Sequence, residues 1–374
     1  MNDRERFLAT MRYQPRDRAP ICDFKFWEET LPEWKTQGLP DAVNWNNSDE
    51  YFGMDNWEHY FPANVGLQPN FGWTKLEDRG DQEVIRDAEG VILLRYKTGS
   101  SIPYYMSHTL VDRDSWEREF LPKLNPKDKR IDVDLPAWEA AAVGKVRTFH
   151  AGSLYGWIRN WMGMENVSYL VHDDPELFEE IVEHLCNLTC TVLQQAYDMG
   201  AKIDALSMWE DMCYNAGPLL SPTHFKQFLV PRYKRITNLA KANGTDVIYL
   251  DSDGKIDDLL PLWLEGGITC MFPIEIGTWG ADPVRYRKEY GKELRMLGGV
   301  DKHALQGNPE TIRAAIRHLT PLVEEGGYIP FLDHRIPPDV TVRNYLLYLQ
   351  IVREEWGHGV NLKPIHPDLL KLLE

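Results

Sequence analysis

The sequence predicts an α/β fold, a (β/α)8 TIM barrel that forms a single domain over residues 1–374. From residue 145 onward, short apolar runs rich in β-branched and aromatic residues alternate with longer amphipathic runs at least six times, with short links. Acidic and other polar residues directly follow most of the apolar runs, as at the carboxyl ends of barrel strands. An open doubly wound sheet is the alternative, but no GxGxxG or GxxxxGK[ST] motif follows a strand.

The first part of the chain is expected to open the barrel. Residues 2–11 predict a short helix with Asp3 and Glu5 near its start. Residues 19–24, around Pro20, are expected to form the first barrel strand. Residues 83–95 hold two strand-forming runs around an acidic turn with a glycine, which indicates a hairpin. The barrel should therefore carry a small β-hairpin and a helical N-terminal excursion.

The rest of the chain supplies the regular alternation. The expected strands are 146–150, 203–208, 247–250, 269–272, 294–297 and 328–332. The expected helices are 175–198, 223–243, 256–264, 283–290, 309–324 and 342–355. With the first strand and one more before residue 145, eight strand–helix units are expected.

Composition narrows the classes of partner. Lys and Arg number 41 and Asp and Glu 57, so the net charge is −16, which argues against nucleic acid and anionic membranes. No apolar run is long enough to span a membrane, and the N-terminus lacks the apolar core of a signal peptide, so we expect a cytoplasmic protein. The five cysteines contain no CxxC pair and are expected to stay reduced.

The most informative stretch is residues 247–254, VIYLDSDG, an apolar strand that runs into two carboxylates. Asp251 and Asp253 lie two residues apart, so they point to the same side if the strand persists. Two such carboxylates need a cation, a proton or a ligand to compensate their charge. The alternative is that they cap the following helix.

Other predicted strands also end in titratable residues. Glu210 and Asp211 follow one strand, Glu275 follows another, and Asp333-His334-Arg335 follow the last. Pairing with Arg335 and Lys255 would neutralise the acids without a metal. The residues predicted as a metal or acid cluster are Asp251, Asp253 and His334, with Glu210 as a fourth member. Oxygen and nitrogen donors suit zinc, manganese or iron.

Four segments together resemble the uroporphyrinogen decarboxylase superfamily, which includes cobalamin-linked methyltransferases. They are GPLLSPTHFKQFLVPRYKRI (217–236), YLDSDG (249–254), MLGGVDKHAL with NPETI (296–312) and GGYIPFLDHRIPPDV (326–340). The resemblance implies a (β/α)8 barrel with its funnel at the carboxyl ends of the strands. The RQAGR signature of the true decarboxylases, which binds substrate carboxylates, is absent from residues 18–29.

The resemblance also implies where a metal would sit. Coenzyme M methyltransferases of the superfamily hold zinc with His-x-Cys after one strand and a Cys after the last. In this sequence Asp251 stands at the His, Asp253 at the first Cys and His334 at the second Cys. An oxygen- and nitrogen-rich site is better suited to gripping an oxygen or nitrogen on a methyl donor than to activating a thiol.

The expected function is therefore transfer of a methyl group from a small O- or N-methylated compound, most simply a methoxy compound, to cobalamin carried on a separate corrinoid protein. The side chains expected to bind the substrate are His150, Tyr155, Trp157, Trp209 and Asn215. A homodimer is compatible with the resemblance. The alternatives are a cofactor-free decarboxylase and a non-catalytic barrel that binds a small molecule or a corrinoid partner.

Overall fold

The computed structural model describes residues 1–56, 58–98 and 103–373. Its centre is a seven-stranded sheet in the order β1-β6-β7-β10-β11-β12-β13, in which all neighbours are parallel. These strands are β1 Glu58–Tyr60, β6 Val146–His150, β7 Ala205–Trp209, β10 Val247–Asp251, β11 Cys270–Ile274, β12 Arg295–Gly298 and β13 Tyr328–Ile329. The strands therefore follow one another in sequence order around the sheet, as in a TIM barrel.

The expectation of eight barrel strands is not met in the described residues, because residues 19–24 do not form a strand. This segment still lies between the two ends of the sheet. The Asp55 N–H donates to the carbonyl of Ile21 at 2.7 Å, close to the start of β1. On the other side, Phe26 makes an isolated parallel bridge with Ile336, beyond β13. Residues 19–26, which we call the closing segment, thus fill the eighth position without a regular ladder.

The closing segment stays irregular for a local reason. Pro20 has no N–H to donate to a neighbouring strand. The Asp23 carboxylate accepts hydrogen bonds from the N–H groups of Phe24 and Leu332, at 2.8 and 3.3 Å, so a side chain takes the place of backbone ladder partners. Lys25 then has a φ of 69°, which turns the chain out of the extended region.

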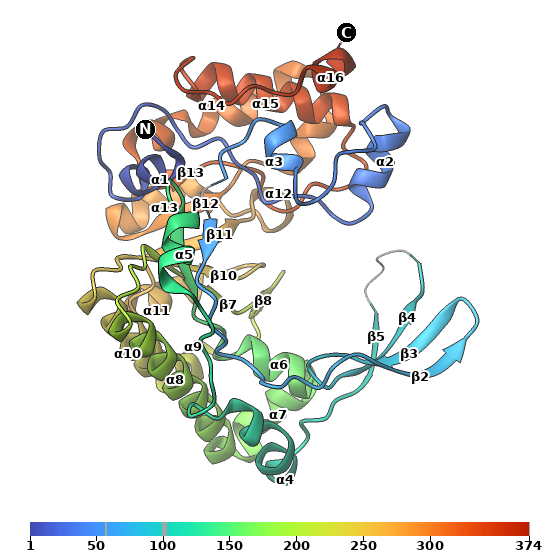
Figure 1. Ribbon diagram of the computed structural model, residues 1–374, viewed down its shortest axis with the longest axis vertical. Helices are drawn as coiled ribbons and strands as arrows, with labels where there is room; N and C mark the ends of the chain where they lie inside the picture. The colour runs from blue at the N-terminus through green and yellow to red at the C-terminus, as the bar shows by residue number, and fades with distance from the viewer. Residues whose placement is uncertain (57, 99–102, 374) are drawn as a thin grey trace.

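Helices cover the outer face of the sheet (Figure 1). The longest, α8 Pro175–Asp198, is capped by Asp174 and buries an apolar stripe at helical spacing that includes Leu177, Ile181 and Leu185. It packs against α10 Val230–Ala242. The other long pair is α14 Pro309–Glu325 and α15 Val342–Trp356, which also pack against each other. The predicted helices at these places are confirmed.

Shorter helices link these elements. They are α1 Asp3–Met11, α2 Thr30–Thr36, α3 Ser48–Tyr51, α4 Arg113–Ser115, α5 Leu135–Ala141, α6 Gly156–Met162, α7 Met164–Asp173, α9 Pro222–His224, α11 Leu260–Glu265, α12 Ile276–Trp279, α13 Pro283–Tyr290 and α16 Pro367–Leu370. The predicted helix at 256–264 begins later, at Leu260, where no side chain caps it. Asp251 and Asp253 therefore do not act as its cap.

The predicted hairpin at 83–95 is confirmed as β3 Gln82–Arg86 paired with β4 Ile92–Tyr96. It belongs to a four-stranded antiparallel sheet that also contains β2 Thr74–Arg79 and β5 Tyr104–Ser107. Figure 1 shows this sheet as an arm that extends away from the seven-stranded sheet. A further two-stranded ribbon, β8 Cys213–Tyr214 with β9 Gly217–Pro218, follows β7.

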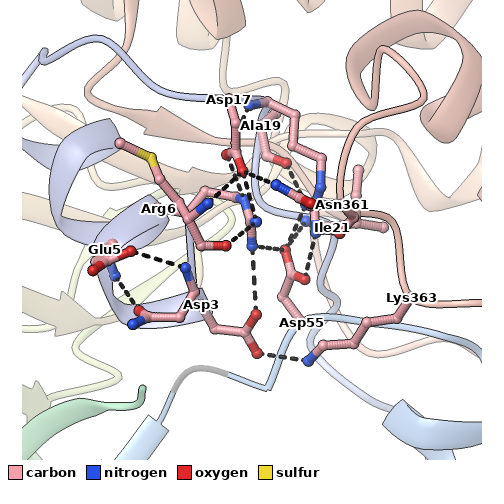
Figure 2. Close-up of polar contacts among 12 residues, drawn as sticks. Asp3, Glu5, Arg6, Asp17, Ala19, Ile21, Asp55, Asn361 and Lys363 are labelled. Atoms are coloured by element: carbon pink, nitrogen blue, oxygen red, sulfur yellow. Dashed lines mark hydrogen bonds and ion pairs between the residues drawn. The ribbon is translucent and has the colours of Figure 1, made fainter. Parts of the chain in front are cut away.

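A network of ion pairs holds the closing segment at one end (Figure 2). The Arg18 guanidinium donates to both Asp55 carboxylate oxygens at 2.7 and 2.8 Å, and both side chains are almost fully buried. Arg6 contacts Asp17 at 2.9 Å and Asp55 at 3.4 Å. Asp55 also accepts from the Ile21 N–H at 3.0 Å. Because loss of one partner leaves a buried charge, breaking the Arg18–Asp55 pair is expected to cost about 3–5 kcal/mol.

None of the helices within the described ranges is both long and apolar enough to cross a lipid bilayer.

Candidate active site

A cavity of about 380 Å³ opens at the carboxyl ends of the strands. His150, Trp209 and Asp251, the last residues of β6, β7 and β10, all line it. Much of its wall is aromatic, formed by Phe24, Trp45, Tyr60, Trp209, Tyr249, Phe272 and Phe331. Its titratable side chains include Asp23, Lys25, Asp49, Glu58, Asp251 and Arg335. A cavity of this size and lining suits a small, flat ligand.

Near the opening of this cavity, which we call the mouth, two groups of described side chains have the spacing of metal ligands. In one, ligand atoms of Asp253, Glu275 and His334 lie within 4.8 Å of one another, and in the other those of Asp211, Asp251 and Asp253 do. Asp253 belongs to both groups, which we call together the mouth cluster. Three of the four residues predicted for a metal or acid cluster are thus brought together, and Asp211 and Glu275 join them.

The protein fold raises the pKa values of several acids in the mouth cluster. Burial, with the nearby carboxylates of Asp253 and Asp211, raises the pKa of Asp251 well above its ordinary value. Burial and the Asp253 charge raise the pKa values of Asp211 and Glu275 as well. The Gly254 N–H donates to Glu275 at 2.8 Å, which opposes that rise. A cation bound among these groups would relieve the repulsion.

His334 is held in place by its neighbours. Its Nε2 lies 3.3 Å from an Asp253 carboxylate oxygen. Its ring stacks on Trp27, with centroids 5.2 Å apart, and meets the edge of Phe24 at 5.6 Å. The second Asp253 oxygen, Oδ1, is buried and has no hydrogen-bond partner among the described residues. One histidine and two carboxylates with an orphaned oxygen fit a catalytic zinc or a similar divalent ion, which needs three protein ligands and an open position.

Glu210, predicted as the fourth member, lies outside the mouth cluster. Its fully buried carboxylate accepts hydrogen bonds from five donors at 2.6–2.9 Å. The donors are the Ser153 and Tyr233 hydroxyls and the N–H groups of Leu154, Tyr155 and Gly156. These bonds use its acceptor capacity, so Glu210 fixes the start of α6 instead of facing the cavity.

The residues predicted to bind the substrate divide into two groups. Trp209 and His150 line the cavity, and His150 Nδ1 lies 3.1 Å from the Ser207 hydroxyl. Tyr155, Trp157 and Asn215 do not line it. Tyr155 is buried beside Phe178, Trp157 stacks on Trp161, and Asn215 is exposed in the β8–β9 turn.

Two partly buried acids in the cavity wall, Asp23 and Glu58, are not among the residues predicted to be catalytic. Asp23 accepts from Tyr345 Oη at 3.2 Å, and burial raises its pKa to about 7. Glu58 accepts from Tyr249 Oη at 2.7 Å and Tyr60 Oη at 2.8 Å, and burial raises its pKa too. The sequence places Asp23 near the end of the first expected strand, at 19–24, whereas nothing in the pattern around β1 distinguishes Glu58.

The family model for uroporphyrinogen decarboxylase (URO-D) matches residues 159–355. A uroporphyrinogen decarboxylase of Chlorobium limicola is 22% identical over 367 residues, covering 93% of this chain and 97% of the relative. The enzyme of Coxiella burnetii is 24% identical, over 49% of each chain. Among solved structures, a methyltransferase from Methanosarcina mazei has a TM-score of 0.59 and 15% identity, covering 95% of this chain and 99% of that chain.

Proposed function

Because the chain belongs to the uroporphyrinogen decarboxylase family, we propose that it is an enzyme with the fold of that family and that it transfers methyl groups. Its reaction would move a methyl group from a small O- or N-methylated compound, most simply a methoxy compound, to the cobalt of a separate corrinoid protein. The main support for this proposal is that the mouth cluster lies beside an aromatic cavity. The methyltransferase neighbour shares the fold and supports no more than that.

The reaction requires help at the leaving group. In the proposed transfer the methyl carbon–oxygen bond would break, the methyl group would pass to cobalt(I) of the corrinoid, which would supply the electron pair of the new bond and be oxidised to cobalt(III), and the oxygen would leave with its bonding pair. That oxygen must then be stabilised by a positive charge or a proton. In the proposal, Asp253, Glu275 and His334 hold a divalent ion, which would supply Lewis acidity toward this oxygen.

Other residues at the site would orient the metal ligands and bind the substrate, each in a role that follows from its position. Asp251 is in the mouth cluster and also lines the cavity, so it connects the proposed metal ligands to the substrate. The rings of Trp27 and Phe24 keep the His334 imidazole oriented toward Asp253. The aromatic wall binds the flat part of the methyl donor and excludes water from it.

Decarboxylation is the second candidate, favoured by the similarity over nearly the full chain to a uroporphyrinogen decarboxylase. The lining of the cavity opposes a polyanionic tetrapyrrole. Among the described residues that line it, five carry carboxyl groups (Asp23, Asp49, Asp55, Glu58 and Asp251), whereas two, Lys25 and Arg335, are Lys or Arg. A substrate with many carboxylates would be repelled by such a lining.

The first test is metal content measured by mass spectrometry on purified protein. We expect about one zinc, manganese or iron per chain, lost in Asp253→Asn and His334→Ala. His303→Ala is the matched control, because His303 is half exposed and pairs with Asp301, outside the mouth cluster. If both variants of the mouth cluster kept the metal, the proposed metal site would be wrong.

The second test is the reaction itself. Wild-type protein with a methoxy compound and reduced corrinoid protein should give the absorption spectrum of methylcobalamin, and Asp253→Asn should not. Release of carbon dioxide from a carboxylated pyrrole or phenol, with no methyl transfer from any donor, would favour the decarboxylase instead.

A further inference from the structure

Arg335 occupies an unusual position at the rim of the cavity. It follows His334, and its guanidinium carbon lies 5.5, 5.6 and 5.5 Å from the ring centroids of Phe24, Trp27 and Trp45. Three aromatic rings therefore surround one cation that also lines the cavity. Cation–π attraction to these rings holds the guanidinium without using its N–H groups in hydrogen bonds.

Within the described residues, no hydrogen bond and no ion pair within 4.0 Å joins the Arg335 guanidinium to another group. The other cation of the cavity is already paired, since Lys25 contacts Asp49. An arginine at the rim of a binding cavity with unused donors is a ready site for an anion.

Most acids of the cavity have partners of their own. Asp55 is paired with Arg18. Glu58 accepts hydrogen bonds from the Tyr60 and Tyr249 hydroxyls. Asp23 accepts from the Tyr345 hydroxyl and from two backbone N–H groups.

Asp251 is the remaining acid of the cavity wall. Arg335 acts on it electrostatically, without an ion pair within 4.0 Å. The competing explanation for Arg335 is therefore that it only compensates the charge of the mouth cluster.

We propose that Arg335 binds a carboxylate group of the substrate, so that the cavity accepts an aromatic carboxylate in preference to the corresponding neutral compound. Identifying that ligand as the methyl donor, a methoxylated aromatic carboxylate, rests on the proposed function. The binding of the anion does not. Arg335 is thus a specificity-determining residue, and the substrate lies with its ring against the aromatic wall.

The surroundings favour a carboxylate over a more highly charged anion. The guanidinium presents two parallel N–H groups that match the two oxygens of a carboxylate. One arginine supplies one positive charge. A phosphate dianion would carry a second negative charge toward Asp251, at a rim with no further unpaired cation among the residues that line the described cavity.

The experiment is isothermal titration calorimetry of the purified protein with 4-methoxybenzoate and with 4-methoxybenzamide. The two ligands have nearly the same shape and differ in charge. We expect wild type to bind the benzoate about tenfold to a hundredfold more tightly, the range for a hydrogen bond to a charged group. Arg335→Gln should abolish this preference, whereas Arg335→Lys should keep part of it because the charge remains.

The matched control is Lys25→Gln, which removes the paired cation of the same cavity and should keep most of the preference. Circular dichroism establishes that each variant is folded. Equal binding of both ligands by wild type, binding of neither, or a preference that persists in Arg335→Gln would overturn the proposal. If Arg335 only compensates the mouth cluster, Arg335→Gln would change the affinities for both ligands equally. A preference that depends on Arg335 without any methyl transfer would overturn only the proposed function.

Discussion

Asp23 illustrates, at the scale of a single residue, how the fold opposes ionisation inside the cavity. Its carboxyl group belongs to the closing segment and is partly buried, and this burial raises its pKa from an ordinary value of 3.8 to about 7. Hydrogen bonds from Phe24, Leu332 and Tyr345 reduce the rise without cancelling it. The folded protein therefore binds a proton at Asp23 over a pH range in which the unfolded chain has released it.

This difference predicts how stability changes with pH. Because the folded pKa is raised, the contribution of Asp23 is most favourable below pH 4 and is lost as the pH rises toward 7, at about 1.4 kcal/mol per pH unit. Asp23→Asn mimics the protonated acid and keeps an acceptor for the two N–H groups. Its free energy of unfolding in urea, relative to wild type, should increase between pH 4 and pH 8 by up to about 4 kcal/mol.

The comparison with wild type removes the effects of the other titrating groups. Asp41→Asn, on the exposed surface, serves as the control and should show no such change. Parallel pH profiles for wild type and Asp23→Asn would contradict a raised pKa at this position.

The sequence predicted Asp251, Asp253 and His334 because each follows a strand, and the structure brings them to one mouth. It did not separate Glu210 from Asp211, which follow the same strand. Asp211 has a φ of 47°, in the left-handed region, so the alternation of the strand is lost between these two residues. Asp211 then joins the mouth cluster while Glu210 faces the start of α6. The alternation of side chains along a strand cannot predict this difference.

At the scale of elements, α6 depends on a side chain from another strand end. Its N-cap position is Tyr155, whose side chain makes no capping bond. Glu210, from the end of β7, accepts the first N–H groups instead and adds its negative charge near the positive end of the helix. The position of α6 is therefore coupled to the loop that carries Asp211.

We expect Glu210→Gln to lower the free energy of unfolding by about 3 kcal/mol, because an amide NH2 would face N–H and O–H donors in a buried site. Urea unfolding in the presence of a chelator measures this without the contribution of a bound metal. Glu176→Gln, an exposed position in the first turn of α8, is the control. A variant that is as stable as wild type but has lost its metal would instead assign Glu210 to the metal site.

At the scale of the whole molecule, the sequence predicted the parallel order of the strands well and their closure poorly. Alternating strands and helices after residue 145 are a local pattern, and local patterns determine most of the sheet. The eighth position is decided by contacts between distant parts of the chain, such as Phe26 with Ile336 and Arg18 with Asp55. Nothing in the apolar run at 19–24 predicts these contacts.

The irregular closing segment also has a consequence for how the protein moves. Regular strands such as β7 and β10 share continuous backbone pairing, whereas residues 19–26 are joined to their neighbours by scattered bonds, several to side chains. Local opening should therefore cost the least free energy along the closing segment.

In hydrogen-exchange mass spectrometry, amides of residues 19–26 should exchange faster than those of β7 and β10, and binding of 4-methoxybenzoate should slow their exchange. Equal protection of the two regions would contradict this. Because Asp23 and Phe24 of the closing segment line the cavity, local opening of the barrel at this segment would also open a path for the ligand.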